Sequence, residues 1–258
     1  MWGLVMKNGL KFVTFNLRIT VDDGLNRWEN RVSHVITKIK KEQPDLIGFQ
    51  ELTDISLGDL KRELIDYVFV GCGRDEKMSG ESVMIAYRKD TLDLLSLDIF
   101  WFSDTPYKPG SKKEIMTLAR PCNVAIFKHQ LTNQLFRIYN THFDHMHSMI
   151  RVQSSQQLLK DLEIREQNLS LPTFIMGDFN AEPQDEEIKI LNDSSFVELQ
   201  DLTQNLDYTF HDYGKMEIKI DYIYATKQIK ASKATAWKDC VDGVYLSDHY
   251  PVMVNISF

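Results

Sequence analysis

Short runs of strand-forming residues alternate with amphipathic stretches along most of this chain. Apolar residues at helical spacing predict helices, and alternating or continuous apolar runs predict strands. Strands are predicted over residues 10–17, 45–50, 67–70, 81–87, 92–102, 122–128, 135–140, 174–177, 219–225, 231–237 and 251–256. Helices are predicted over 25–39, 55–65, 148–167 and 186–191, and loops over 71–73 and 103–113. Strands outnumber helices, and helices lie between some of them. This order predicts an α/β fold in which two packed mixed sheets are flanked by helices, formed by residues 1–258 as one domain.

Several of the predicted strands end in polar residues. The clearest case is the apolar run 174–177, which is followed directly by Asp178 and Asn180. Residues two apart on an extended chain point to the same side, so these two side chains are expected to project together. The same change from apolar to polar residues occurs at 14–16, 48–51 and 139–142, and the set 247–249 precedes the last apolar run. We therefore predict one shared polar site at one edge of a sheet.

Composition is that of an ordinary globular protein. Hydrophobic residues make up 43% of the 258 residues and charged residues 26%. No apolar stretch approaches the roughly 18 residues that span a bilayer, so no membrane association is expected. Residues 1–7 have no secretory-signal pattern. The three cysteines are far apart and odd in number, which is typical of a protein from the reducing cytoplasm.

The formal net charge of −7 bears on the choice of substrate. Proteins that bind long nucleic acids usually carry clustered Lys and Arg, because neutralising phosphates supplies much of the affinity. Here the basic clusters, at 38–41 and 112–113, are short and local. A small phosphorylated substrate fits this charge better than RNA or DNA.

Six short motifs, taken in order, resemble the endonuclease/exonuclease/phosphatase superfamily. They are Thr14-Phe15-Asn16, Gln50-Glu51, Thr141-His142-Phe143-Asp144-His145, Gly177-Asp178-Phe179-Asn180, Ile220-Asp221-Tyr222-Ile223 and Ser247-Asp248-His249-Tyr250-Pro251. The segments 82–90, 100–106 and 141–145 look like a branch of small bacterial members. The resemblance implies a DNase I-like fold, a four-layered α/β sandwich. It also implies hydrolysis of phosphoesters with a divalent metal ion.

The resemblance implies that Glu51 is the principal metal ligand, with Asn16 beside it and Asp248 closing the site. Oxygen donors of this kind suit Mg²⁺, or Mn²⁺, better than zinc. Some nucleases of the family carry an acid two residues after the first Asn, where this chain has Arg18; this departure favours a single metal ion. A zinc site within residues 142–147 is the alternative, but their spacing differs from the H-x-H-x-D-H pattern of metallo-β-lactamases.

The catalytic roles are also implied by the resemblance. Asp178 resembles the residue that positions or deprotonates the attacking water, and Asn180 its partner at the phosphate. His249 resembles the histidine that stabilises the transition-state oxyanion, while His142 resembles the one that contacts the phosphate. Asp221 is predicted to orient His249 and to raise its pKa, because a neighbouring carboxylate favours the imidazolium. Taken alone, the acid and amide at 178–180 could instead be turn residues after a strand.

Four further residues are predicted around the substrate. Glu81 is expected to support His142, and Arg120 to make a second phosphate contact unless it forms a surface salt bridge. In the bacterial branch this arginine precedes a different sequence, so the pocket wall after it is expected to differ. His145 is predicted to contact the substrate. Trp101 would line the pocket or, alternatively, belong to the core.

These predictions describe a Mg²⁺-dependent enzyme that cleaves a small phosphorylated substrate by in-line attack of water. One alternative is a nuclease or deadenylase acting on RNA or DNA. The other is a catalytically inactive binding module that keeps the fold. Sequence alone leaves open the identity of the substrate, the choice between monoester and diester, and the oligomeric state.

Overall fold

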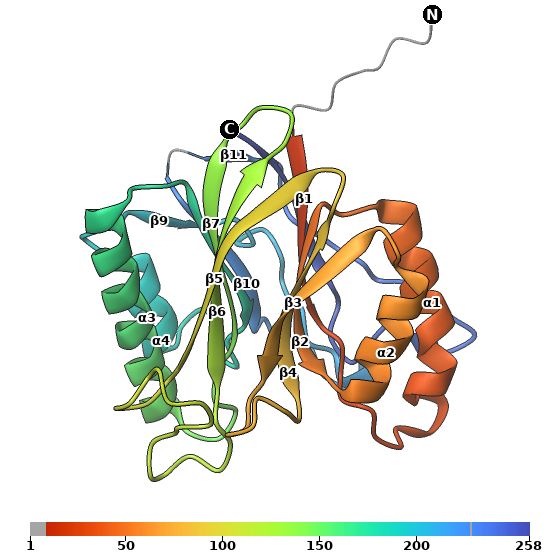
Figure 1. Cartoon of the computed structure of the whole chain (residues 1–258). Coiled ribbons are helices and arrows are strands. Elements are labelled where there is room, and N and C mark those ends of the chain that lie inside the picture. Colours follow the sequence, from red (N-terminus) through yellow and green to blue (C-terminus); the bar gives the residue numbers. More distant parts are fainter. Residues whose placement is uncertain (1–8, 228) are drawn as a thin grey trace, which may run out of the picture.

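Two β-sheets pack face to face, and helices cover their outer faces (Figure 1). The structure, a computed structural model, describes residues 9–227 and 229–258. The expectation concerning residues 1–7 therefore lies outside the described residues. Within the described ranges, no helix has the length and apolar character needed to cross a membrane.

The first sheet is built from strands within residues 9–88 and from C-terminal strands within residues 230–257. Its order is β11 (Lys230–Ala231), β15 (Val252–Ser257), β1 (Gly9–Asn16), β2 (Leu46–Leu52), β4 (Ser82–Arg88) and β3 (Tyr67–Gly73), with β12 (Thr235–Ala236) also paired to β15. Strands β1 and β2 are parallel. The short helix η1 (Gly24–Asn26) and helix α1 (Trp28–Glu42) connect them, and helix α2 (Asp54–Glu63) follows β2.

The second sheet repeats this arrangement. Its order is β5 (Leu92–Trp101), β6 (Pro121–His129), β7 (Leu135–His142), β8 (Thr173–Asp178), β10 (Asp221–Thr226) and β9 (Leu199–Asp201). The parallel strands β7 and β8 are connected by helix α3 (Ser148–Asn168), and helix α4 (Glu186–Asn192) follows β8. The short elements η2 (Asp212–Gly214), β13 (Cys240–Val241) and β14 (Val244–Tyr245) complete the described structure.

Burial on both faces explains why the central strands are almost continuously apolar. On β1, Phe12 points between the sheets and meets Phe174 of β8 edge to face, with ring centroids 4.9 Å apart. Its neighbour Val13 packs on the other side, with Ile39 of α1. On the outer face of the second sheet, Leu158 of α3 belongs to a third apolar cluster. The four layers are therefore helix, sheet, sheet and helix, which confirms the predicted fold class.

Two predicted elements differ from the structure. The strand predicted to end at residue 70 continues to Gly73, through a glycine-rich segment that was expected to be a loop. Gly71 makes this possible: its φ is 128°, and a Cβ there would lie 2.6 Å from the carbonyl oxygen of Val83 on β4. The strand predicted over 231–237 is only two short pairings, β11 and β12. After Ser232, which still donates its N–H to Asn255 of β15, the pairing is interrupted, and the N–H of Ala234 donates to Asn205 instead.

Candidate active site

Polar side chains from both sheets meet at the carboxyl ends of the two parallel strand pairs. Asn16 ends β1, Glu51 lies near the end of β2, and His142 and Asp178 end β7 and β8. His142 and Asp178 are direct neighbours in the parallel register, and Asp178 is opposite Asp221 in the antiparallel pairing of β8 with β10. In open α/β sheets, ligands bind beyond the carboxyl ends of strands. The predicted shared site therefore lies at one edge of the sandwich.

The backbone is strained at this edge. Glu51 and Asn180 have φ values of 61° and 49°, in the left-handed region that non-glycine residues rarely adopt. Gly177 has φ 151°, and a Cβ there would lie 2.0 Å from the carbonyl oxygen of Thr141 on β7. This glycine lets β8 approach β7 just before Asp178. Strain of this kind is typical of functional sites, where the surrounding fold holds side chains in a required position.

Asp178 is the centre of the site and is 1% exposed. Its Oδ2 accepts a hydrogen bond from Nδ2 of Asn16 (2.9 Å), and its Oδ1 accepts one from the backbone N–H of Asn180 (2.8 Å). Nε2 of His142 and Nε2 of His249 lie 3.4 and 3.8 Å from the same Oδ2. Burial alone would raise the pKa of Asp178, but the two histidines and these hydrogen bonds outweigh it and lower the pKa. The carboxylate is therefore ionised at neutral pH.

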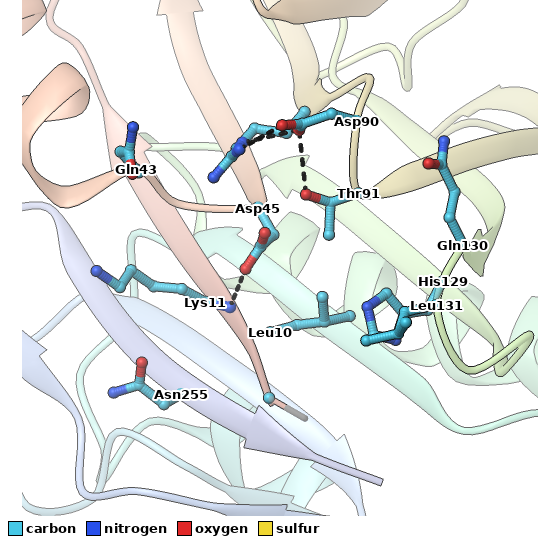
Figure 2. A pocket seen from close by; sticks show the side chains of 12 residues that line it. Leu10, Lys11, Gln43, Asp45, Asp90, Thr91, His129, Gln130, Leu131 and Asn255 are labelled. Atoms are coloured by element: carbon cyan, nitrogen blue, oxygen red, sulfur yellow. Dashed lines mark hydrogen bonds and ion pairs between the residues drawn. The ribbon is translucent and has the colours of Figure 1, made fainter. Parts of the chain in front are cut away.

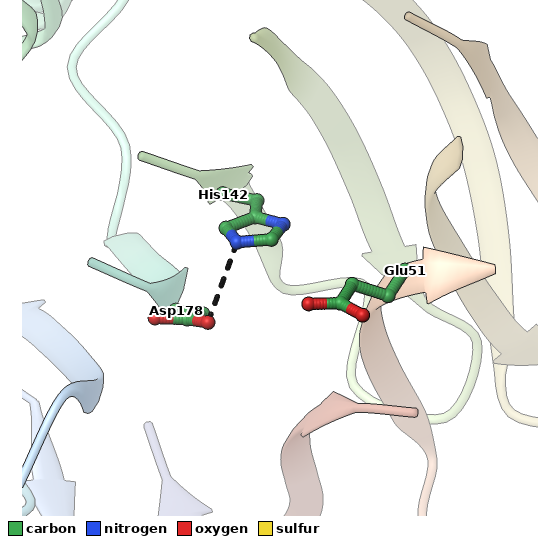
Figure 3. A group of neighbouring side chains, drawn as sticks. All are labelled: Glu51, His142 and Asp178. Carbon is green, nitrogen blue, oxygen red and sulfur yellow. Dashed lines mark ion pairs between the residues drawn. The ribbon is translucent and has the colours of Figure 1, made fainter. Parts of the chain in front are cut away.

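Glu51 faces Asp178 across a gap that suits a metal ion. One ligand atom from each of Glu51, His142 and Asp178 lies within 4.8 Å of the others, and Figure 3 shows the three side chains directed toward one another. The backbone N–H of Ile19 and Nδ2 of Asn16 donate to the two oxygens of Glu51, at 2.9 and 3.0 Å. The carboxylate oxygens in this group are donors that Mg²⁺ and Mn²⁺ prefer, so these residues fit the metal implied by the sequence.

Asn16 bridges the two acids through its amide nitrogen. Its oxygen accepts a hydrogen bond from the backbone N–H of Arg18 at 3.0 Å. In this arrangement the nitrogen, and not the oxygen, faces Glu51 and Asp178. Asn16 therefore positions both carboxylates, and its predicted role as a direct ligand stays a prediction.

His249 is paired with a buried acid. Its Nδ1 lies 2.8 Å from Oδ2 of Asp221, and the two side chains are almost completely buried. Burial lowers the pKa of His249, but Asp221, followed by Asp178 and Asp248, raises it to about 10. Burial raises the pKa of Asp221, and the imidazolium opposes that shift. At neutral pH His249 is a cation whose free Nε2 points toward Asp178.

His142 is held by a guanidinium instead. Nη1 of Arg120 lies 3.0 Å from Nδ1 of His142, and Nη2 lies 3.1 Å from Nδ1 of His145. Arginine can only donate, so each Nδ1 accepts and the remaining proton of each ring is on Nε2. Oε1 of Glu81 lies 3.5 Å from Arg120 and 3.6 Å from His142. The structure thus brings together all four residues, with Arg120 buried rather than at the surface.

Comparison with known proteins identifies the family to which this site belongs. The sequence pattern of the endonuclease/exonuclease/phosphatase family matches residues 13–249, which include every predicted site residue. This chain belongs to that family. Members of the family hydrolyse phosphoesters, so the protein is an enzyme of that class.

Relatives of known structure agree with this assignment. A family member from Bacteroides vulgatus is 28% identical, with a TM-score of 0.90 over 97% of this chain and 99% of its own. A mannosyl-6-phosphatase from Bacteroides thetaiotaomicron is 27% identical, with a TM-score of 0.87 over 96% and 100%. These matches confirm the resemblance to a bacterial branch. A protein of Acanthamoeba polyphaga mimivirus is 30% identical over 206 residues, 76% of this chain and 72% of its own.

Asp248 is the third predicted metal ligand of this protein. Both of its carboxylate oxygens already have partners. Its Oδ1 accepts from the hydroxyl of Ser247 at 3.0 Å, and its Oδ2 lies 3.6 Å from Nε of Arg18. Among the described residues, neither group of side chains that could hold a metal includes Asp248. The neighbours of Asp248 therefore favour an ion pair with Arg18.

Trp101 belongs to the core rather than to the pocket. Its side chain is 2% exposed and packs with Cys72 and Ala119. The indole N–H donates to the carbonyl oxygen of Arg74 at 2.9 Å. Trp101 thus contacts the segment that carries Arg74, whose guanidinium forms an ion pair with Glu81. The packing of Trp101 is that of the core alternative, and its predicted substrate contact stays a prediction.

Sequence analysis gives no role to Gln50, Asn140 and Thr209, which support the site from between the sheets. Gln50 donates to Oδ1 of Asn140 at 2.8 Å, and Asn140 donates to the carbonyl oxygens of Phe49 and Met84 across the sandwich. Thr209 accepts from the backbone N–H of Asp221 at 3.0 Å. Asn140 lies two residues before His142 on the same strand, so a period-two reading of polar residues would have found it.

A cavity of about 400 Å³ lies away from this site. Lys11, Asp45 and His129 are among its lining residues, and the N–H of Lys11 donates to Oδ2 of Asp45 at 2.8 Å (Figure 2). Lys11 and Asn16 are five residues apart on β1, which places the cavity roughly 16 Å from the catalytic edge along the strand. No predicted site residue lines it.

Proposed function

We propose that this protein is a Mg²⁺-dependent phosphatase or phosphodiesterase that acts on a small phosphorylated substrate, with Mn²⁺ as an alternative metal. Water attacks in line, and no covalent enzyme intermediate forms. The observation that carries this proposal is the position of Asp178, whose Oδ2 faces both His142 and His249 while Glu51 lies across the gap.

Asp178 accepts the proton of the attacking water, because its lowered pKa keeps it ionised. The backbone N–H of Asn180 holds one oxygen of this carboxylate, and the amide of Asn16 orients the other, Oδ2, which faces the two histidines. In the proposal, His249 donates from Nε2 to a non-bridging oxygen as charge develops there. His142 donates from Nε2 to the phosphate, and Asn180 contacts it with its side chain.

Glu51, supported by Asn16, is the residue that would hold the metal ion. A bound divalent ion polarises the phosphoryl oxygen and stabilises the charge that develops on the leaving group. Both oxygens of Glu51 are fixed by N–H donors, so the carboxylate is oriented before any ion binds. Asp248 is a further candidate ligand.

A small substrate is supported by charge and by relatives. The chain has a formal net charge of −7. The cations nearest the catalytic groups, Arg120 and Arg18, already face carboxylates at 3.5 and 3.0 Å, and do not form a free basic track. The structurally similar mannosyl-6-phosphatase acts, by its name, on a phosphorylated sugar. Sugar phosphates are therefore the first substrates to test.

The test is a hydrolysis screen of sugar phosphates, other phosphomonoesters and phosphodiesters with Mg²⁺, Mn²⁺ or a chelator. We expect metal-dependent release of phosphate from at least one small substrate, and its loss in Glu51→Gln. Glu63→Gln, an exposed acid at the end of α2, is the matched control and should keep the wild-type rate. Equal rates in Glu51→Gln and wild type would refute the proposal. Preferential, salt-sensitive cleavage of oligonucleotides would instead favour the nuclease alternative.

A further inference from the structure

Two loops from different sheets meet at the catalytic edge and enclose a cavity of about 370 Å³. Residues 74–81 connect β3 to β4 in the first sheet, and residues 102–120 connect β5 to β6 in the second. Strand β4 runs antiparallel to β2, and β6 to β7, so both loops lie at the edge where β2 and β7 end (Figure 1). The volume of the cavity is within the range of small-molecule sites.

The two loops are in backbone contact. Gly110 has φ 72°, and a Cβ there would lie 2.4 Å from the backbone nitrogen of Glu76. A side chain at this position would therefore push the loops apart. Within the first loop, the N–H of Asp75 donates to the carbonyl oxygen of Ser79 at 3.2 Å, which holds that wall in shape. The cavity is thus preformed where the loops meet.

Arg74 belongs both to this cavity and to the catalytic site. Its side chain lines the cavity, and its Nη1 lies 2.5 Å from Oε2 of Glu81. The other oxygen of Glu81 faces Arg120 and His142, at 3.5 and 3.6 Å. Ala119, the residue before Arg120, also lines the cavity. A substrate whose phosphate contacts His142 therefore has this cavity beside it.

The cavity lining carries charged groups of both signs. The acids are Asp75 and Glu76, and the bases are Arg74, Lys77 and Lys112. An anion placed here would meet two carboxylates, and a cation would meet three basic side chains. A hydroxyl group can donate to a carboxylate and accept from an ammonium or a guanidinium. Several neutral hydroxyl groups therefore match this lining better than a second charged group.

Part of the same lining is apolar. Leu118 and Ala119 lie in the cavity wall, Leu118 half-buried and Ala119 buried. A sugar ring presents C–H groups on its faces and hydroxyl groups around its rim. Small-molecule sites combine apolar surface with a few polar groups that fix the orientation of the ligand. The combination found here fits a sugar ring.

We propose that this cavity is the subsite that binds the sugar ring of a phosphorylated sugar while the phosphate is cleaved at Asp178. The inference rests on the proposed function for the position of the phosphate. The lining residues contact a part of the substrate that does not react. Loss of such contacts raises KM and leaves kcat unchanged.

The test compares wild type with Glu76→Ala/Lys77→Ala, which removes one acid and one base that are exposed in the cavity. The substrates are glucose, mannose and galactose phosphorylated at the primary hydroxyl, and ethyl phosphate, which has no ring, all with Mg²⁺. We expect KM for the best sugar phosphate to rise by about ten-fold at unchanged kcat, and both constants for ethyl phosphate to stay the same. The matched control, Lys40→Ala/Glu63→Ala, removes an acid and a base from helices α1 and α2 and should change none of these constants.

An unchanged KM for the sugar phosphates, or an equal rise for ethyl phosphate, would overturn the inference. A wild-type enzyme that prefers ethyl phosphate to every sugar phosphate would also overturn it and leave the proposed function intact. If no ester is cleaved, the proposed function fails, and ¹H–¹⁵N NMR with the three free sugars decides on the subsite. Shifts of the Gly110 and Leu118 amide signals in wild type, lost in Glu76→Ala/Lys77→Ala, would retain it. No such shift with any of the sugars would refute it.

Discussion

Two histidines lie at similar distances from the carboxylate of Asp178, but the groups that contact their other ring nitrogen carry opposite charges. His249 is backed by the carboxylate of Asp221, at 2.8 Å, and His142 by the guanidinium of Arg120, at 3.0 Å. A carboxylate stabilises the doubly protonated ring, whereas a guanidinium requires a lone pair on the nitrogen it contacts. One histidine is therefore a cation and the other a neutral donor with its proton on Nε2.

The difference in charge suits the two histidines to different tasks in the proposed reaction. A fixed cation is best placed where negative charge increases during the reaction, and a neutral donor can contact a phosphate without adding charge beside Arg120. In the proposed function, the same residue type therefore takes two roles, because a different partner contacts each ring. Four variants test this difference, and they are ordered by the size of the change that we expect.

Asp178→Asn should have the largest effect, because it replaces the carboxylate that both histidines face with a neutral amide. The amide cannot accept a proton from water, and we expect kcat to fall by about 10⁴-fold. Steady-state hydrolysis of the best small substrate is the measurement. Asp193→Asn, an exposed acid after α4, is the control and should keep the wild-type rate. A loss of less than ten-fold in Asp178→Asn would contradict its role as the base.

Asp221→Asn should convert the cationic side into a neutral one. The pKa of His249 is about 10 with Asp221 present, so the cation is kept through neutral pH and lost as pH rises through that value. Without the carboxylate the pKa falls, and the alkaline decline in kcat should move to lower pH. At pH 9 we expect a loss of about 10²-fold relative to wild type, and a smaller loss at pH 7. A pH profile with an unchanged alkaline limb would refute the pairing.

Arg120→Met tests the neutral side. His142 and His145 lose the donor that fixes their tautomers, and we expect kcat/KM to fall about ten-fold, the equivalent of one hydrogen bond to a charged group. The alkaline limb should stay where it is in wild type, because His249 keeps its partner. The measurement is the pH dependence of kcat in Arg120→Met and in Asp221→Asn, and the position of the alkaline limb is compared. If both variants shift the limb equally, the two sides do not differ as described.

Glu81→Gln should have the smallest effect, and on stability rather than on rate. Burial alone would raise the pKa of Glu81, but the positive charges beside it, including the guanidinium groups of Arg120 and Arg74, lower it to about 2. This ionised acid therefore stabilises the fold above its unfolded pKa, and the contribution is lost as pH falls toward 2. Urea unfolding at pH 6 and pH 3 should show that wild type loses about 2 kcal/mol more than Glu81→Gln over this range. Equal losses would contradict the ion pair.

The sequence was sufficient to predict the layers and the residues that meet at the catalytic edge. Continuous apolar runs and their polar ends are local signals, and parallel pairing of β1 with β2 and of β7 with β8 brings those ends together. What surrounds them depends on pairings between distant segments. The contacts of Arg18 with Asp248 and of Trp101 with Arg74 have no local signal. Local patterns alone therefore leave Trp101 open between pocket and core, and do not reveal the contact of Asp248 with Arg18.

The direct test of the contrast between the two histidines is the ¹⁵N NMR spectrum of the imidazole rings at pH 8, with Mg²⁺ present. His249→Ala and His142→Ala variants assign the signals. The account predicts that His249 has two protonated nitrogens, whereas His142 has a proton on Nε2 and a lone pair on Nδ1. A neutral His249, or a proton on Nδ1 of His142, would contradict it.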